Sequence, residues 1–281
     1  MLIYYQWDKI PLTTHLRKDI DIMEPAGVKT RRKQAIEIVR EANDLLLDCH
    51  GKSIVFDWKG TNDLKTAADE ASERFICGRI RELFPDDAIL AEEGTSVAGN
   101  KLVWFVDPLD GTWEFRLGFS SYFAVSIGVG IGVVPVFGVV GLPARKEIYY
   151  SNQHGAFCSE RKLYVVEPDE SAHAVLLLHG GKVTENKVRI AQMEQRLIGN
   201  VAPIPYVGSA ATCLALVASG RANAYVGIGM DPWDLAGGVP ICVAAGGKAT
   251  KLDGTPWQFG DRDAVVSHPD FHDWIIEETN K

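Results

Sequence analysis

Residues 104–115 read WFVDPLDGTWEF, a run of apolar and aromatic residues that carries two carboxylates three positions apart. Asp107 and Asp110 would destabilise a buried core strand unless a salt bridge, a turn or a metal ion accommodates them. Pro108 lacks an N–H group and holds the residue before it in extended geometry. We therefore expect a strand that ends in a turn, with both carboxylates facing one point.

The Gly111-Thr112 pair follows the second carboxylate directly. A glycine and a hydroxyl residue at the start of a helix or turn offer backbone N–H groups that can cradle a phosphate, and the hydroxyl can orient a water molecule. Carboxylates beside such a cradle suit hard divalent cations, which take oxygen ligands and keep several waters. The combination favours phosphoryl hydrolysis at a metal site.

Each acidic segment also has a simpler interpretation when it is taken alone. DPLDG, residues 107–111, is typical of a turn, and AEEG, residues 91–94, is typical of a solvated helix end or loop. Asp234 would serve as the N-cap of the helix that follows it. The joint occurrence of these segments in one chain shifts the balance toward a metal site.

Composition limits the classes of partner. The chain has 281 residues, is 46% hydrophobic, and carries a formal net charge of -8 with a pI near 5.4. An acidic chain lacks the positive field that a nucleic acid polymer or an anionic membrane requires, so any anionic substrate must meet local cations. Five scattered cysteines without a CxxC pair and the absence of a signal-peptide core or a long apolar run predict a reduced, cytoplasmic protein.

The first half of the chain combines two amphipathic helices with a sheet. Helical spacing of apolar residues predicts helices at 28–51 and 66–85. Short Val-, Ile- and aromatic-rich runs broken by Gly and Pro then predict a mainly antiparallel sheet, at 88–90, 102–106, 122–134, 135–143 and 147–152.

From about residue 160, strand-like and helical segments alternate, which is typical of α/β packing. Strands are predicted at 173–181, 202–208 and 224–229, and helices at 185–199, 211–222 and 233–247. We divide the chain into an N-terminal extension at 1–27, an α+β half with the metal-binding motifs at 28–159, and an α/β half at 160–281. The two halves are expected to form one catalytic unit with the chemistry in the crevice between them.

Three motifs in order carry a family resemblance: EE at 92–93, DPLDGT at 107–112 and WDLAGG at 233–238. Their order and spacing resemble the inositol monophosphatase family, magnesium-dependent and lithium-sensitive phosphatases related to fructose-1,6-bisphosphatase. The match runs from about Asp63 to AVVSHP at 264–269. The resemblance implies a layered α-β-α-β-α sandwich and a homodimer.

The resemblance also implies a ligand set for two or three Mg²⁺ ions, with Mn²⁺ as an alternative. Glu92, Asp107 and the carbonyl oxygen of Leu109 would hold one ion. Asp107, Asp110 and Asp234 would hold a second, and Glu92 with waters a third, weaker one. The implied function is hydrolysis of a small-molecule phosphate monoester, such as inositol monophosphate, by a metal-activated water.

Catalytic and substrate roles follow from the same resemblance. Thr112, hydrogen-bonded to Asp69, would orient the attacking water with Glu92 as a further catalytic residue, whereas Asp63 would support the site without binding metal. The implied phosphate- and alcohol-binding residues are Gly111, Thr112, Gly208, Ser209, Ala210 and Gly227.

Two departures from the family leave the substrate open. Inositol-specific members carry a Glu that contacts sugar-like hydroxyls at the position of Gly227, which weakens the inositol assignment. Trp113-Glu114-Phe115 is closer to the pattern of 3′-phosphoadenosine 5′-phosphate phosphatases. A 3′(2′),5′-bisphosphate nucleotidase or another sugar-phosphate phosphatase is therefore the alternative, and a non-catalytic regulatory relative a remote one.

Three further patterns are discounted. IGVGIGVV at 127–134 lacks the spacing and following helix of a dinucleotide loop. LHGG at 178–181 lacks a nucleophile elbow elsewhere in the chain and is interpreted as a strand end. His268 and His272, four residues apart, lack a third metal ligand nearby.

Overall fold

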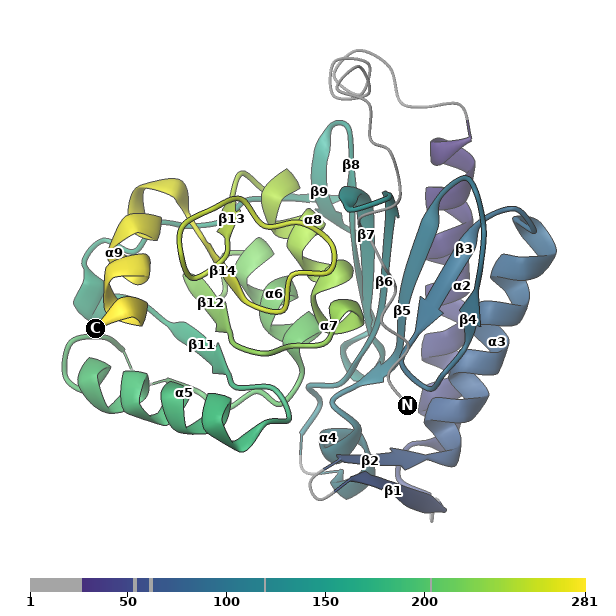
Figure 1. The fold of residues 1–281 in the computed structure, drawn as a ribbon, viewed down its shortest axis with the longest axis horizontal. Coiled ribbons are helices and arrows are strands. Elements are labelled where there is room, and N and C mark those ends of the chain that lie inside the picture. Colours follow the sequence, from purple (N-terminus) through teal and green to yellow (C-terminus); the bar gives the residue numbers. More distant parts are fainter. Residues whose placement is uncertain (1–26, 53–54, 61–62, 119, 203) are drawn as a thin grey trace.

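The computed structural model describes residues 27–52, 55–60, 63–118, 120–202 and 204–281. These residues form five alternating layers of helix and sheet, which Figure 1 shows from α2 and α3 on one side to α5 and α9 on the other. The predicted α-β-α-β-α sandwich is confirmed. The predicted N-terminal extension lies outside the described residues, apart from Gly27.

The first sheet has eight strands in the order β10-β9-β8-β7-β6-β5-β3-β4. It is antiparallel except for the parallel pair β3 and β5, so the prediction of a mainly antiparallel sheet is confirmed. β5 lies between β3 and β6 and is buried along its whole length. The strands are β3 (Ala88–Ala91), β4 (Ser96–Val97), β5 (Val103–Asp110), β6 (Ala124–Ile131), β7 (Val134–Leu142), β8 (Glu147–Asn152), β9 (Gly155–Cys158) and β10 (Arg161–Leu163).

Two long helices, α2 (Val28–Cys49) and α3 (Ala67–Leu83), cover the outer face of this sheet. The apolar stripes that predicted them pack on the sheet, where Ile38, Leu46 and Ile76 are fully buried. α3 begins with a capping box: the Thr66 side chain accepts from the Asp69 N–H, and the Asp69 side chain accepts from the Thr66 N–H. This cap fixes Asp69 at the inner end of the helix.

The middle layer consists of α6 (Ala210–Ala218), α7 (Pro232–Ala236) and α8 (Gly238–Ala244), packed between the two sheets. The single helix predicted at 233–247 is wrong, because the chain divides at Gly237 into α7 and α8. Gly237 lies against β7, where a Cβ on Gly138 would come 1.9 Å from the Gly237 carbonyl oxygen. The close approach of backbone to backbone therefore requires glycine at 138.

The second sheet has four strands in the order β11-β12-β14-β13, covered on the outside by α5 and α9. The strand predicted at 202–208 is wrong: its described residues form no strand, and Pro205 has no N–H for a ladder. The elements are β11 (Leu176–His179), β12 (Ala224–Gly227), β13 (Lys248–Thr250), β14 (Ala264–Ser267), α5 (Thr184–Leu197) and α9 (Pro269–Asn280).

Small elements complete the fold below the two sheets in Figure 1: the hairpin of β1 (Phe56–Gly60) and β2 (Asp63–Thr66) lies beside α4 (Thr112–Leu117). The 3-10 turns are η2 (Pro143–Arg145) and η3 (Ser171–His173). All five cysteines are unpaired, as predicted. Within the described ranges, every helix is too short or too polar to span a bilayer.

Candidate active site

The site begins at the carboxyl end of β5. Asp107 pairs with Ser126 and Asp110 with Ala124, and the register between them is irregular. The Leu109 N–H donates to Asp107 Oδ1 at 3.1 Å, and Ser72 Oγ donates to the Pro108 carbonyl oxygen at 2.9 Å. The predicted turn is therefore an irregularity within the strand, and it places the two buried carboxylates near one another.

Two other segments bring carboxylates to the same place. The Glu92 N–H donates to the Val106 carbonyl oxygen at 3.1 Å, which holds Glu92 beside β5. Asp234 lies in the first turn of α7, where its Oδ2 accepts from the Asp231 N–H at 2.8 Å. Asp231 is the N-cap of this helix, so the simpler interpretation of Asp234 as an N-cap is wrong.

The three aspartates resist ionisation together. Burial raises the pKa of Asp107 well above its usual range, and the neighbouring Glu92, Asp110 and Asp234 add to this. Burial also raises the pKa of Asp234 and brings that of Asp110 to about 7, although Ala211 and Ser209 donate hydrogen bonds to Asp110. A group of buried oxygens that repel one another when charged is the kind of donor set that a hard divalent cation stabilises.

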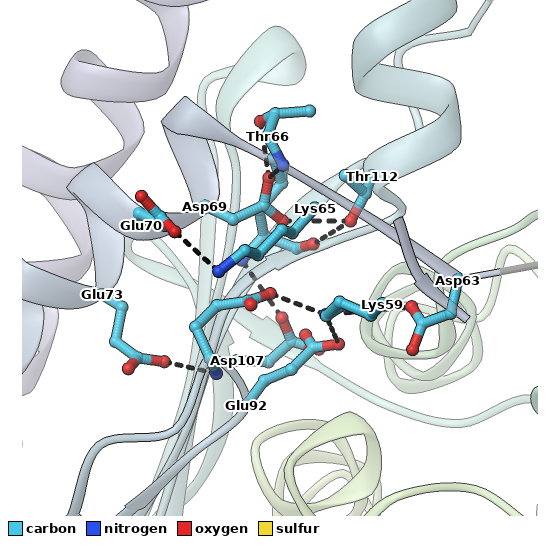
Figure 2. A network of polar contacts seen from close by, with 12 residues as sticks. Lys59, Asp63, Lys65, Thr66, Asp69, Glu70, Glu73, Glu92, Asp107 and Thr112 are labelled. Carbon is cyan, nitrogen blue, oxygen red and sulfur yellow. Dashed lines mark hydrogen bonds and ion pairs between the residues drawn. The ribbon is translucent and has the colours of Figure 1, made fainter. Parts of the chain in front are cut away.

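Glu92 has a different environment, because two lysines contact it. Lys59 Nζ lies 2.9 Å and Lys182 Nζ 3.0 Å from Glu92 Oε1. Burial opposes ionisation of Glu92, but the two ammonium groups outweigh burial and lower its pKa. Figure 2 shows the contact of Lys59 with Glu92.

Both lysines join further carboxylates and were not predicted. Lys182 lies 3.1 Å from Asp63 Oδ2 and 3.7 Å from Asp231 Oδ2, and Lys59 lies 2.7 Å from Glu93 Oε1. The supporting role predicted for Asp63 agrees with this ion pair. Lys182 directly follows the two glycines of LHGG, and this position was the feature of the sequence that could have indicated a role for it. The interpretation of LHGG as a strand end is correct.

Thr112 and Asp69 form the contact that the resemblance implied. Thr112 Oγ1 lies 3.1 Å from Asp69 Oδ1 and 3.1 Å from the Leu109 carbonyl oxygen. Asp69 Oδ2 accepts from the Thr66 N–H at 2.7 Å and from the Thr66 hydroxyl at 2.5 Å, as Figure 2 shows. Burial raises the pKa of Asp69 to about 7 against the effect of these donors.

Gly111 connects β5 to α4 in a conformation that other residues rarely adopt. Its φ is 87°, and a Cβ there would lie 2.9 Å from the Tyr122 carbonyl oxygen. The N–H groups of Gly111 and Thr112 donate no hydrogen bond to the described part of the chain. The turn thus leaves two donors available beside the carboxylates, as a phosphate cradle requires.

A cavity of about 760 Å³ opens above these groups. Glu92, Asp107, Asp110 and Asp234 line it together with the Gly111-Thr112 turn, and residues of β11, α4 and α5 form the remaining wall. The residues of that wall include Trp113, Leu117, His179, Lys187 and Ile190, and Tyr206 from the segment between α5 and α6 also lines the cavity.

Of the residues predicted to bind the alcohol, Gly208, Ser209, Ala210 and Gly227, only Gly208 lines the cavity. Gly208 lines the cavity, and its missing side chain admits Glu114, whose Oε1 would lie 1.9 Å from a Cβ at 208. Ser209 Oγ donates to Asp110 Oδ2 at 2.8 Å, so it orients a carboxylate instead of facing the cavity. Ala210 and Gly227 are buried and do not line the cavity.

The side chain of a neighbouring residue fills the space beside Gly227. A Cβ on Gly227 would lie 2.6 Å from the hydroxyl oxygen of Tyr225, two residues earlier on the same strand. Tyr225 is fully buried, and its hydroxyl has no hydrogen-bond partner among the described residues. The strand therefore uses the space beside residue 227 for a tyrosine ring.

Only one set of three ligand-type side chains in the described ranges has all its ligand atoms within 4.8 Å of one another: Glu167, His268 and Asp270. This set is on the surface, and His268 also caps α9 by accepting from the Asp270 N–H. The active-site carboxylates are more widely spread. Ser209 and Ala211 hold one oxygen of Asp110, and the Asp231 N–H holds one of Asp234.

Comparison with known proteins agrees with this geometry. The model of the inositol monophosphatase family matches residues 23–281. The chain is 33% identical over 246 residues to the inositol-1-monophosphatase of Bacillus subtilis, covering 85% of this chain and 92% of that protein. It is 31% identical over 249 residues to the fructose-1,6-bisphosphatase/inositol-1-monophosphatase of Thermotoga maritima, covering 88% and 94%.

Solved structures give the same result. The structure of an IMPase from Thermotoga maritima superimposes with a TM-score of 0.82 at 28% identity, covering 89% of this chain and 97% of that one. The family model spans nearly the whole described chain and includes all three acidic motifs. The chain therefore belongs to the inositol monophosphatase family.

Proposed function

We propose that this phosphatase hydrolyses a small-molecule phosphate monoester, such as inositol monophosphate, to the alcohol and inorganic phosphate. The observation that carries the proposal is the set of four carboxylates beside the Gly111-Thr112 turn on the floor of one cavity. The fold brings together four carboxylates from three separate segments of the chain: Glu92, Asp107, Asp110 and Asp234.

The donor set fits divalent cations. Glu92, Asp107 and the Leu109 carbonyl oxygen would hold one Mg²⁺, and Asp107, Asp110 and Asp234 a second. A third, weaker position would use Glu92. Bound there, the cations supply charge stabilisation of phosphoryl oxygens and lower the pKa of a water molecule.

Thr112 and Asp69 orient the attacking water in this proposal. When the Thr112 hydroxyl donates its proton to Asp69 Oδ1 or to the Leu109 carbonyl, its lone pairs remain to accept from water. Thr66 holds the other oxygen of Asp69, so the acceptor cannot rotate freely. Because Asp69 is held in place, less entropy is lost when Thr112 and the attacking water take up the reactive arrangement.

The phosphate would bind on the N–H groups of Gly111 and Thr112. Lys182 would contribute charge beside Glu92 and Asp63, which it already neutralises in part. The alcohol would extend toward the wall formed by Trp113, His179 and α5.

Inositol monophosphate and other sugar phosphates are the favoured substrates, because the similar proteins carry these activities in their names. A 3′(2′),5′-bisphosphate nucleotide is the weaker candidate. Trp113 supports it in one respect, since this side chain is 37% exposed and lines the cavity, where a base could stack on it.

Phosphate release from inositol 1-phosphate, fructose 1,6-bisphosphate and 3′-phosphoadenosine 5′-phosphate tests the proposal. We expect turnover that needs Mg²⁺ or Mn²⁺, stops in EDTA, and falls by at least about 10²-fold in Asp107→Asn and Asp234→Asn. Normal turnover by a folded Asp234→Asn variant would refute the metal assignment. The exposed Asp169→Asn serves as the matched control.

Family membership also supports two further proposals: inhibition by lithium that strengthens as substrate rises, and a homodimer. The scattered cysteines favour a third, a cytoplasmic location. Millimolar lithium in the phosphate-release assay at saturating substrate tests the first. Sedimentation of the purified chain tests the second.

A further inference from the structure

His179 lies at the alcohol side of the cavity in a fixed position. It is the last residue of β11, pairs with Gly227 across the parallel ladder, and accepts the Ile228 N–H on its carbonyl oxygen at 2.9 Å. His179 is one of the residues that line the cavity. It stands at a strand end whose backbone cannot shift without breaking the second sheet.

Two glycines after His179 hold the loop in place. A Cβ on Gly180 would lie 2.7 Å from Lys187 Cα, and one on Gly181, which has a φ of 54°, would lie 2.4 Å from the Gly229 carbonyl oxygen. The loop is thus pressed between α5 and the end of β12. Within four residues it presents His179 to the cavity and Lys182 to the carboxylates.

The imidazole lacks a partner in the described part of the chain. His179 Nδ1 is buried without a hydrogen bond, and no bond to the other ring nitrogen is found among the described residues. Rotation about the broad terminal torsion of histidine exchanges the two sides of the ring, so either nitrogen can face the cavity. A buried polar atom without a partner is costly, which makes a ligand group the natural complement.

The charge state of the ring narrows the choice of ligand. Burial lowers the pKa of His179 to about 4, and the ammonium group of Lys187 contributes. A neutral imidazole offers one donor and one acceptor, as does an alcohol hydroxyl. A phosphate oxygen would use only the donor.

We propose that His179 binds a hydroxyl group on the alcohol half of the substrate and so selects phosphate esters of polyols. The inference rests on the proposed phosphatase function and adds a residue that determines specificity for the leaving group. Gly227, the residue paired with His179 on the neighbouring strand, offers no side chain.

The test compares a polyol ester with an ester whose leaving group has no further hydroxyl. kcat and KM are measured for inositol 1-phosphate and phenyl phosphate with Mg²⁺, in wild type, His179→Ala and His179→Gln. Taking the ratio of variant to wild type for each substrate removes the difference in leaving-group reactivity. The control is His173→Ala, which removes an exposed imidazole outside the cavity.

We expect His179→Ala to lose about 3- to 10-fold more kcat/KM on inositol 1-phosphate than on phenyl phosphate, chiefly through KM. His179→Gln should recover most of this loss, because the amide keeps a donor and an acceptor. Equal losses on the two esters, or a wild type that does not prefer inositol 1-phosphate, would overturn the inference and leave the phosphatase function standing. A wild type that hydrolyses neither ester with metal present would refute the proposed function itself.

Discussion

Asp110→Asn should make the metal-free protein more stable while it abolishes activity. Asp110 is buried, and its Oδ2 accepts from Ser209 Oγ at 2.8 Å and from the Ala211 N–H at 2.6 Å. An asparagine carbonyl oxygen can accept both bonds, so the substitution removes the negative charge and keeps the local contacts. The variant therefore isolates the cost of one carboxylate charge in the cluster.

The pKa of Asp110 gives the size and sign of the effect. Burial is the main reason that it lies at about 7 instead of 3.8, and at about 1.4 kcal/mol for each pH unit the difference corresponds to about 4 kcal/mol. Because the folded state holds this proton more tightly than the unfolded state, the cost is absent below about pH 4 and complete above about pH 7. Wild-type stability in EDTA should fall across this interval, and that of the variant should fall less.

Urea unfolding in EDTA at pH 5 and pH 8 measures the difference. We expect Asp110→Asn to exceed wild type by about 4 kcal/mol at pH 8 and by much less at pH 5, with phosphate release reduced at least about 10²-fold. Adding Mg²⁺ should stabilise wild type more than the variant. A variant that is no more stable than wild type at pH 8, or whose gain is the same at both pH values, would refute the reasoning.

The remaining predictions concern one residue each. Thr112→Ala should lower kcat about 10²-fold with little change in KM, and Thr112→Ser should recover it, as phosphate release will show. Gly111→Ala should cost about 1–3 kcal/mol in urea unfolding, because φ there is 87°. Glu147→Gln should cost about 1 kcal/mol at pH 7 without affecting kcat: chiefly the Arg221 hydrogen bond lowers the pKa of Glu147 to about 2, so this contribution, present above pH 4.5, should disappear as the pH falls toward 2.

The sequence predicted the parts of the site that are close together in the chain. Asp107, Asp110, Gly111 and Thr112 lie within six residues, and the properties of Pro and Gly were enough to expect a local change of direction there. The change between helical and strand-like periodicity predicted the two helices, the antiparallel sheet and the α/β half, whereas the arrangement in five layers came from the family resemblance. The placement of Asp234 beside β5 depended on the family resemblance, because more than a hundred residues separate the two segments.

The sequence did not predict the contacts that form only on folding. Lys59 and Lys182 reach Glu92 from segments 33 and 90 residues away, and a single lysine in an acidic chain has the pattern of a solvated surface residue. The role assigned to Gly227 depended on the family position alone and could not anticipate the ring of Tyr225 beside it. Helical periodicity also did not predict the break at Gly237, which lies three residues before Pro240, a residue without an N–H to continue the helix.

The distribution of charge explains how an acidic chain can take an anionic substrate. Lys182 lines the cavity but is already paired with Glu92 and Asp63, and Lys187, which also lines the cavity, lies near His179. Asp107, Asp110 and Asp234 have no such ammonium partner among the described residues. When they are ionised, these carboxylates repel a phosphate dianion but attract divalent cations to the β5 side of the cavity. In the proposed mechanism, cations supplied from solution would therefore offset the negative charge beside the Gly111-Thr112 turn and so favour phosphate binding there.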